Sequence, residues 1–164
     1  MRLPFRIAAL AMLVLTLGTA LVACSDSSCY ENGNSLPLAS LYVGQSQQTI
    51  GGLTVMGIGA PGDSLLLDSA SVSQMYLPLR ASVTSTSYEL RRWLVDGTDR
   101  ICYRDTIKLE YQPIEYFHSI ECGAMFNFQV SHVSHTSHTI DSVVLLTPLI
   151  TNSLTPALRI HFAR

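Results

Sequence analysis

Three histidines in one short segment have the spacing that most directly suggests metal chemistry. His132, His135 and His138 recur at every third position, and imidazole nitrogens are common zinc ligands. In an extended strand, however, His132 and His138 would lie about 20 Å apart and His135 would point the other way. A helix would gather all three, but the intervening serine, threonine and valine residues are poor helix formers. We therefore expect no metal site and interpret the segment as a polar, exposed hairpin tip.

Other catalytic patterns are missing from the sequence or have simpler interpretations. No Gly-x-Ser-x-Gly elbow for a nucleophilic serine occurs. The glycine-rich stretch 57–62 has no lysine, so we interpret it as a turn and not as a phosphate-binding loop. Glu110 and Glu115 lie opposite apolar positions, as residues on solvated strand faces do, which argues against a glycosidase carboxylate pair. We predict that the protein is not an enzyme and uses no cofactor.

An aromatic and basic segment is the remaining candidate for ligand binding. It contains Tyr88, Arg91, Arg92 and Trp93, the last being the sole tryptophan of the chain. Aromatic rings stack on sugar faces, and arginine guanidinium groups bind carboxylates, so this segment suits a carbohydrate or a peptide. A tryptophan is also common at the centre of a β-sandwich core. We expect Trp93 to be such a core residue, and we keep Trp93, Arg91 and Arg92 as the alternative, a binding set.

The first residues of the chain have the three parts of a secretory signal. Arg2 and Arg6 form a positive region, an apolar run covers 7–17, and small residues follow. The sequence Leu21-Val22-Ala23-Cys24 resembles a bacterial lipobox, which implies cleavage before Cys24 and a lipid on its thiol. One acyl chain binds membranes weakly, whereas two or three anchor a protein stably. The alternatives are an uncleaved transmembrane helix and an ordinary cleaved signal.

The residues that follow Cys24 favour a location in the outer membrane. Ser25 stands where lipoproteins retained in the inner membrane of enteric bacteria have an aspartate. Only Asp26 and, further on, Glu31 are acidic, so the acidic run that directs some lipoproteins to the cell surface is weak. We expect a protein anchored in the outer membrane through Cys24 and facing the periplasm, with the cell surface as the alternative.

Composition indicates one globular domain. Hydrophobic residues make up 48% of the chain and charged residues 13%, which argues against disorder. Without the two arginines of the leader, eight basic and twelve acidic residues remain, so no basic surface for a nucleic acid is expected. We predict a signal peptide at 1–23, a lipid-anchored polar tether at 24–35 and one β domain at 36–164.

Alternation of apolar and polar residues predicts that this domain is all-β. In the clearest case, Ile107, Leu109 and Tyr111 point one way and the residues between them point the other. Short patterns of this kind recur about every ten residues, with Asp96-Gly97 as a strong turn signal and Gln112-Pro113 as an interruption. No segment has convincing helical periodicity. We predict a single antiparallel β-sandwich of about 8–9 short strands, with a small barrel as the alternative.

Four cysteines bear on the compartment. If Cys24 carries the lipid, then Cys29, Cys102 and Cys122 remain, and an oxidising compartment predicts one disulfide and one thiol. Three pairings are open from the sequence alone. A Cys29–Cys122 bridge would close a loop of roughly 90 residues and stabilise the fold by about 4 kcal/mol in the chain-entropy model.

Three segments together resemble a family of small uncharacterised lipoproteins from the Bacteroidota. They are the lipobox cysteine with Cys29 five residues later, the stretch 105–111, and the stretch 115–123, which ends in Cys122-Gly123. The resemblance implies that Cys29 pairs with Cys122 and that Cys102 is the extra thiol. It implies a location in the envelope and no particular activity.

These features together predict a lipid-anchored envelope protein that binds or supports another envelope component. Strand edges and loops would offer the contacts for a protein partner. The alternative is a surface module that binds a glycan or another polymer through Trp93 and its arginines. An enzyme or a metal protein is the third and least favoured class.

Overall fold

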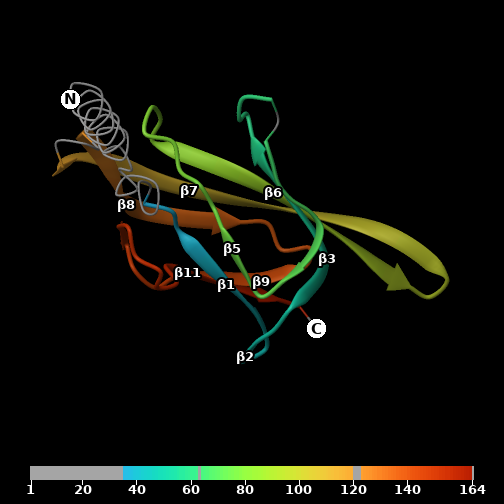
Figure 1. The fold of residues 1–164 in the computed structure, drawn as a ribbon. Helices are drawn as coiled ribbons and strands as arrows, with labels where there is room; N and C mark the ends of the chain where they lie inside the picture. Colours follow the sequence, from blue (N-terminus) through green and yellow to red (C-terminus); the bar gives the residue numbers. More distant parts are fainter. Residues whose placement is uncertain (1–34, 63, 120–122, 164) are drawn as a thin grey trace, which may run out of the picture. The chain divides into compact units, whose positions relative to one another are not determined.

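All regular elements that the structure describes are β-strands. The computed structural model describes residues 35–62, 64–119 and 123–163, and Figure 1 shows its strands in two sheets. The predicted all-β sandwich-like class is confirmed. Within these ranges the strands number eleven and are less uniform than expected, from 2 to 21 residues long. No helix in the described part of the chain is long and apolar enough to span a membrane.

The predicted signal, lipobox and disulfide fall on parts of the chain that are not described. Cys24 and Cys29 precede residue 35, and Cys122 lies in the gap at 120–122. Cys102 is described, is partly buried and is a free thiol.

The first sheet joins the two ends of the domain. β1 pairs with β11, and the other strands complete the order β2-β1-β11-β9, with β5 also on β1. The β1–β11 pair is parallel, which departs from the antiparallel arrangement that we predicted. The strands are β1 (Leu38–Val43), β2 (Ser46–Gln47), β5 (Gln74–Tyr76), β9 (Ile140–Leu145) and β11 (Leu158–Phe162).

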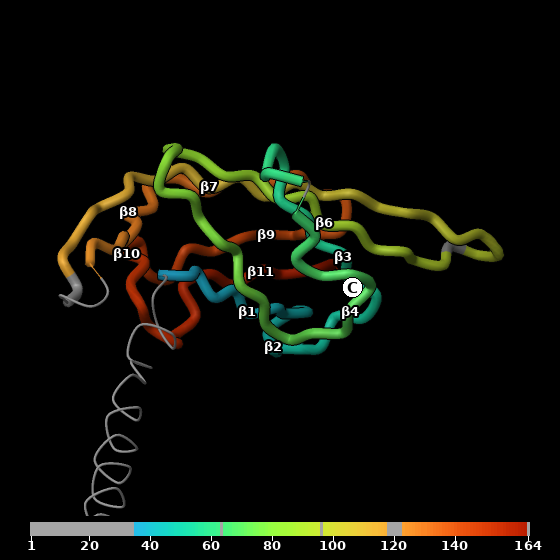
Figure 2. Tube along the Cα trace, turned by 45° about the horizontal axis from the view of Figure 1, so that its top comes forward, coloured from blue at the N-terminus to red at the C-terminus, as the bar shows by residue number. Residues whose placement is uncertain are grey.

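The second sheet is fully antiparallel and is organised around one long strand, β7. The first half of β7 pairs with β6 and its second half pairs with β8. The two hairpins that these pairs form therefore point to opposite ends of the sheet, as Figure 2 shows. In the order β10-β8-β7-β6-β3-β4, the strands are β10 (Leu149–Ile150), β8 (Gly123–His135), β7 (Asp99–Ser119), β6 (Ser85–Asp96), β3 (Ile50–Ile58) and β4 (Leu65–Val72).

The core lies where alternate residues of both sheets meet. The predicted inward row Ile107, Leu109 and Tyr111 is confirmed, since each of these residues is at most 2% exposed. Burying such apolar surface is the main favourable term in folding. Other fully buried members are Ala39, Leu41, Leu53, Val55, Leu77, Tyr88, Ile140, Leu158, Ile160 and Phe162.

β7 runs straight through Pro113, where an interruption was expected. The Tyr111 N–H donates to Thr84 O on the β6 side at 2.9 Å, and residues two apart in a strand face the same side. The nitrogen of Pro113 therefore also faces that side, but β6 begins at Ser85, which pairs with Glu110, and so does not reach as far as Pro113. Because no partner strand is present there, the missing N–H of proline breaks no ladder hydrogen bond.

Past the edge of its neighbours, the β6–β7 hairpin continues as a two-stranded ribbon. β3 last pairs with β6 at Arg92, and β8 last pairs with β7 at Ile107. We call residues 93–102 the arm; it extends to the right in Figure 2. Its turn lies at Gly97, whose φ of 63° is easy for glycine and strained for other residues, and it confirms the turn expected at Asp96-Gly97.

Candidate binding surface

The face of β6 and β7 that points away from the core carries a row of polar, charged and aromatic side chains. Residues directly opposite in an antiparallel pair share a face, so the register defines the members of this row. We call the row the outer strip. At about 3.3 Å per residue, it extends for roughly 26 Å from Trp93 to Ser85. Its members are Ser85, Ser87, Glu89, Arg91, Trp93 and Val95 on β6, and Arg100, Cys102, Arg104, Thr106, Lys108 and Glu110 on β7.

Trp93 lies at the arm end of the outer strip and is exposed to solvent. Its exposed fraction is 53%, so the expectation that it forms the centre of the core is wrong. The reason is parity. The buried residues of β6 are Thr86, Tyr88 and Leu90, at every second position, and Trp93, three positions after Leu90, therefore points to the opposite face. The guanidinium carbon of Arg100 lies 5.5 Å from the Trp93 ring centroid.

The structure separates the two neighbouring arginines of the candidate binding set. Arg91 shares the outer strip with Trp93 and forms an ion pair with Glu89. Arg92 points to the other face, where its guanidinium carbon lies 4.9 Å from the ring centroid of Phe162. Burial lowers the pKa of Arg92, and the nearby Asp105 carboxylate partly opposes this effect. Arg92 therefore packs against the core, while Arg91 and Trp93 remain together.

Two further arginines extend the basic part of the outer strip. Within the described residues, neither Arg100 nor Arg104 forms an ion pair, so their charges attract anions. Sequence reasoning missed both residues. The turn at Asp96-Gly97 was the available signal, because it sets the register that places Cys102 opposite Trp93 and so brings the two arginines onto the same face.

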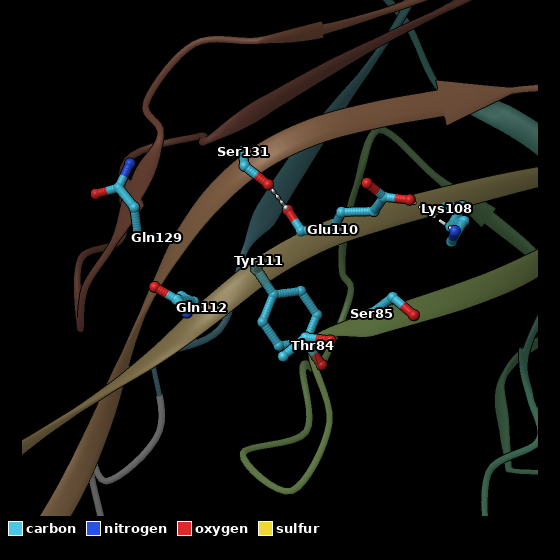
Figure 3. A pocket seen from close by; sticks show the side chains of 8 residues that line it. All are labelled: Thr84, Ser85, Lys108, Glu110, Tyr111, Gln112, Gln129 and Ser131. Atoms are coloured by element: carbon cyan, nitrogen blue, oxygen red, sulfur yellow. Dashed lines mark hydrogen bonds and ion pairs between the residues drawn. The ribbon is translucent and has the colours of Figure 1, made fainter.

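A polar cavity of about 560 Å³ lies at the other end of the outer strip (Figure 3). It opens where β6 begins and where β8 has a bulge, since Ser131 is the extra residue between His132 and Val130. The Ser131 hydroxyl donates to Glu110 O at 3.1 Å. The lining offers mostly hydroxyl, amide and charged groups, from Thr84, Ser85, Lys108, Glu110, Tyr111, Gln112, Gln129 and Ser131.

The two charged residues beside this cavity neutralise each other. Lys108 Nζ lies 2.7 Å from Glu110 Oε1. The hydrogen bond from Lys108, together with its positive charge, lowers the pKa of Glu110. The cavity end of the outer strip is therefore polar without net charge, whereas the arm end is basic.

The three histidines lie in separate settings. His132 pairs with Glu110, His135 Nδ1 lies 2.9 Å from Thr136 O, and His138 Nδ1 lies 3.2 Å from Asp105 Oδ1. Their segment is not the hairpin tip that we expected, because β8 belongs to the second sheet and β9 to the first. The connection crosses between the sheets. Among the described residues, no group of three or more His, Cys, Asp or Glu side chains could hold a metal ion.

Asp105 holds this crossover against β7. The residue is 1% exposed, and its carboxylate accepts hydrogen bonds at 2.7–2.8 Å from the backbone N–H groups of His138 and Thr139 and from the hydroxyls of Thr136 and Thr139. Burial raises the pKa of Asp105, but these hydrogen bonds together outweigh burial and hold the pKa below its ordinary value. The carboxylate therefore fixes the crossover against β7, three residues after the arm ends at Cys102.

The chain matches one known protein family. Residues 52–162 match DUF6452, a family of unknown function. The chain belongs to this family. The matched segment runs from within β3 to the end of β11 and so includes the outer strip and all of the second sheet except the first two residues of β3. No curated protein and no solved structure matches the chain.

Proposed function

We propose that this protein is a lipid-anchored envelope protein without catalytic activity, which binds another envelope component through the outer strip. The exposure of Trp93 carries the proposal. Trp93 is 53% exposed on an arm that no further strand covers within the described residues. A large aromatic side chain left in water contributes little to folding, and such residues are enriched where proteins bind ligands.

The chemistry of the outer strip favours an acidic polymer as the ligand. A sugar ring would stack on Trp93, and Arg100 and Arg104 would bind carboxylate or phosphate groups beside it. The hydroxyl and amide groups of the cavity would then accept and donate hydrogen bonds to sugar hydroxyls further along. A row of roughly 26 Å suits an extended chain better than one small molecule. The proposed ligand is therefore an acidic glycan of the cell envelope.

A protein partner is a second candidate because the first sheet has an open edge. β9 pairs with β11 on one side and is the last strand of that sheet among the described residues. An extended segment of a partner could add to this edge through backbone hydrogen bonds. Val144, at 42% exposure, would contact such a segment.

The anchor and location are part of the same proposal. The lipobox-like Leu21-Val22-Ala23-Cys24 supports a lipid on Cys24, a signal at 1–23 and a tether at 24–35 before the domain. We place the protein at the outer membrane of a Bacteroidota bacterium, facing the periplasm or, alternatively, the cell surface. Protease treatment of intact cells, with a periplasmic protein as control, distinguishes the two faces. Digestion of this protein alone would establish surface exposure.

Binding to immobilised acidic and neutral polysaccharides tests the role of the outer strip. We expect the full-length lipoprotein to bind an acidic polysaccharide, and Trp93→Ala to weaken binding at least about tenfold, or roughly 1.4 kcal/mol. Tyr76→Ala is the matched control, because Tyr76 is an exposed aromatic residue of the other sheet, at 44%. Equal binding by the two variants would contradict the proposal.

The β9 edge is tested separately by crosslinking in cells. Val144→Lys places a charge on the edge, which should prevent strand addition. Loss of a crosslinked protein in this variant, with polysaccharide binding unchanged, would favour the protein partner. Retention of the same crosslink would argue against the β9 edge.

A further inference from the structure

We propose that the end of the domain that carries Phe117, Phe126 and Leu154 rests on the surface of a lipid bilayer, so that the arm points away from the membrane. This inference rests on the lipid anchor proposed for Cys24. It adds a second contact with the membrane and an orientation, neither of which follows from the anchor alone.

Exposed apolar side chains gather at this end. Phe117 is 68% exposed and Phe126 is 36% exposed. Phe126 pairs with Glu115, and Phe117 pairs with Ala124, so the two rings share one face of the ribbon. Phe128, on the same face, is only 5% exposed because it belongs to the core. The core-facing side of the second sheet thus continues beyond the point where the core covers it, and there it carries the two rings together with the exposed Glu115.

A neighbouring loop adds a third apolar side chain. Leu154, at 78%, is the most exposed large hydrophobic residue described. It lies in the segment that follows β10, and β10 pairs with β8 at Phe128 and Gln129. We call Phe117, Phe126 and Leu154 the apolar end. Figures 1 and 2 both show this segment on the same side of the domain as the β7–β8 hairpin.

The chain enters the domain beside the apolar end. The Ser35 hydroxyl donates to Asn127 Oδ1 at 2.9 Å, and Asn127 is next to Phe126 in the sequence. Leu36 lines a small cavity together with Leu149 and Ser153, the latter in the loop of Leu154. Ten residues lie between Cys24 and Ser35, and the eleven steps of a fully extended chain reach at most about 40 Å. A lipid on Cys24 therefore holds Ser35, which lies beside the apolar end, within about 40 Å of the bilayer.

The arm lies at the far end of the same strand. Cys102, which pairs with Trp93, and Phe117 are separated by about 50 Å of extended chain along β7, although the sheet curls. Contact between the apolar end and the bilayer therefore directs the arm outward. A bilayer fits the apolar end, because exposed aromatic and aliphatic side chains enter the interfacial region readily.

Tryptophan quenching by lipids tests the orientation, since the natural chain has one tryptophan and it lies on the arm. The full-length lipoprotein is reconstituted in vesicles whose acyl chains carry bromine, which quenches nearby tryptophan fluorescence. We expect wild-type Trp93 to keep its emission. In a Trp93→Phe, Phe117→Trp double variant, we expect the emission to fall roughly threefold and shift to shorter wavelength.

Trp93→Phe, Leu154→Trp provides a second reporter in case the Phe117 variant does not fold. Flotation of the vesicles and labelling with palmitate check the anchor itself. A protein that floats and is labelled, but whose introduced tryptophans are unquenched, overturns the orientation and leaves the anchor intact. Quenching of Trp93 instead would show that the arginine-rich arm meets the lipid. A protein that neither floats nor takes up palmitate would overturn the anchor and this inference together.

Discussion

Asp105 shows how one buried charge organises a connection that has no regular structure of its own. Its carboxylate satisfies two backbone N–H groups and two hydroxyls in the crossover that links the two sheets. Hydrogen bonds to an ionised group are stronger than those between neutral groups. The crossover is therefore fixed by electrostatics as well as by packing.

Replacing Asp105 with asparagine should destabilise the fold. Asparagine keeps one acceptor oxygen but turns an NH₂ group toward the donors of Thr139, so at least one buried donor loses its partner. We expect the free energy of unfolding to fall by about 2–3 kcal/mol in urea titrations. Asp99→Asn, on the exposed arm, should change it by less than about 0.5 kcal/mol. Equal effects of the two substitutions would show that the hydrogen bonds of Asp105 contribute no net stability.

The wild type and Asp105→Asn should also differ in the pH dependence of their stability. The pKa of Asp105 lies below its ordinary value of 3.8, so the folded state holds its proton less tightly than the unfolded chain does. The stabilisation is therefore present above that ordinary value and is lost as the pH falls through the folded-state pKa. Unfolding measured from pH 5 downward should show a steeper loss for the wild type than for Asp105→Asn.

At this scale the sequence predicted strand parity better than it predicted burial. Alternation correctly assigned Ile107, Leu109 and Tyr111 to the core, because apolar residues at every second position of a strand all point to the same face. Trp93 was assigned to the core from its residue type alone, yet its parity and its place beyond β3 leave it exposed. Asp105 was missed as a structural residue because its partners lie more than 30 residues away.

Among the elements, β7 is the one that the sequence described least well. Its 21 residues were expected as two shorter strands because Gln112-Pro113 has the composition of a break. A proline interrupts a sheet only where its nitrogen faces a partner strand, and that depends on neighbours that a sequence does not specify. The strand class itself was predictable because alternation is local, whereas strand length depends on pairing.

The side to which each nitrogen of β7 points gives a prediction. Pro113→Ala should leave the free energy of unfolding within about 0.5 kcal/mol of the wild type, since no ladder hydrogen bond is restored. Gln112→Pro should lower the free energy of unfolding by about 3 kcal/mol, because the backbone N–H of residue 112 faces β8, where Gln112 pairs with Gln129. Denaturant titration of both variants measures the contrast. A comparable loss in both would mean that the two positions face equivalent partners.

For the whole molecule, the thiols report on the predicted disulfide, which lies outside the described residues. If Cys29 pairs with Cys122, the mature protein purified without reductant should present only Cys102 to an alkylating reagent under denaturing conditions. Mass spectrometry should then find one adduct before reduction and three after it, in addition to the lipid. Three adducts before reduction would exclude any disulfide, and an adduct on Cys29 or Cys122 would exclude this pairing.

The parallel pairing of β1 with β11 has a consequence for how the chain matures. Ala39 lies beside Leu158, so the first strand of the domain cannot find its partner until nearly the last residues are available. Contacts between such distant residues form slowly, because a long loop must close first. A chain threaded through a secretion channel from its leading end would keep the first sheet open until translocation is almost complete. Such a delay favours passage in an unfolded state and leaves final assembly to the far side of the membrane.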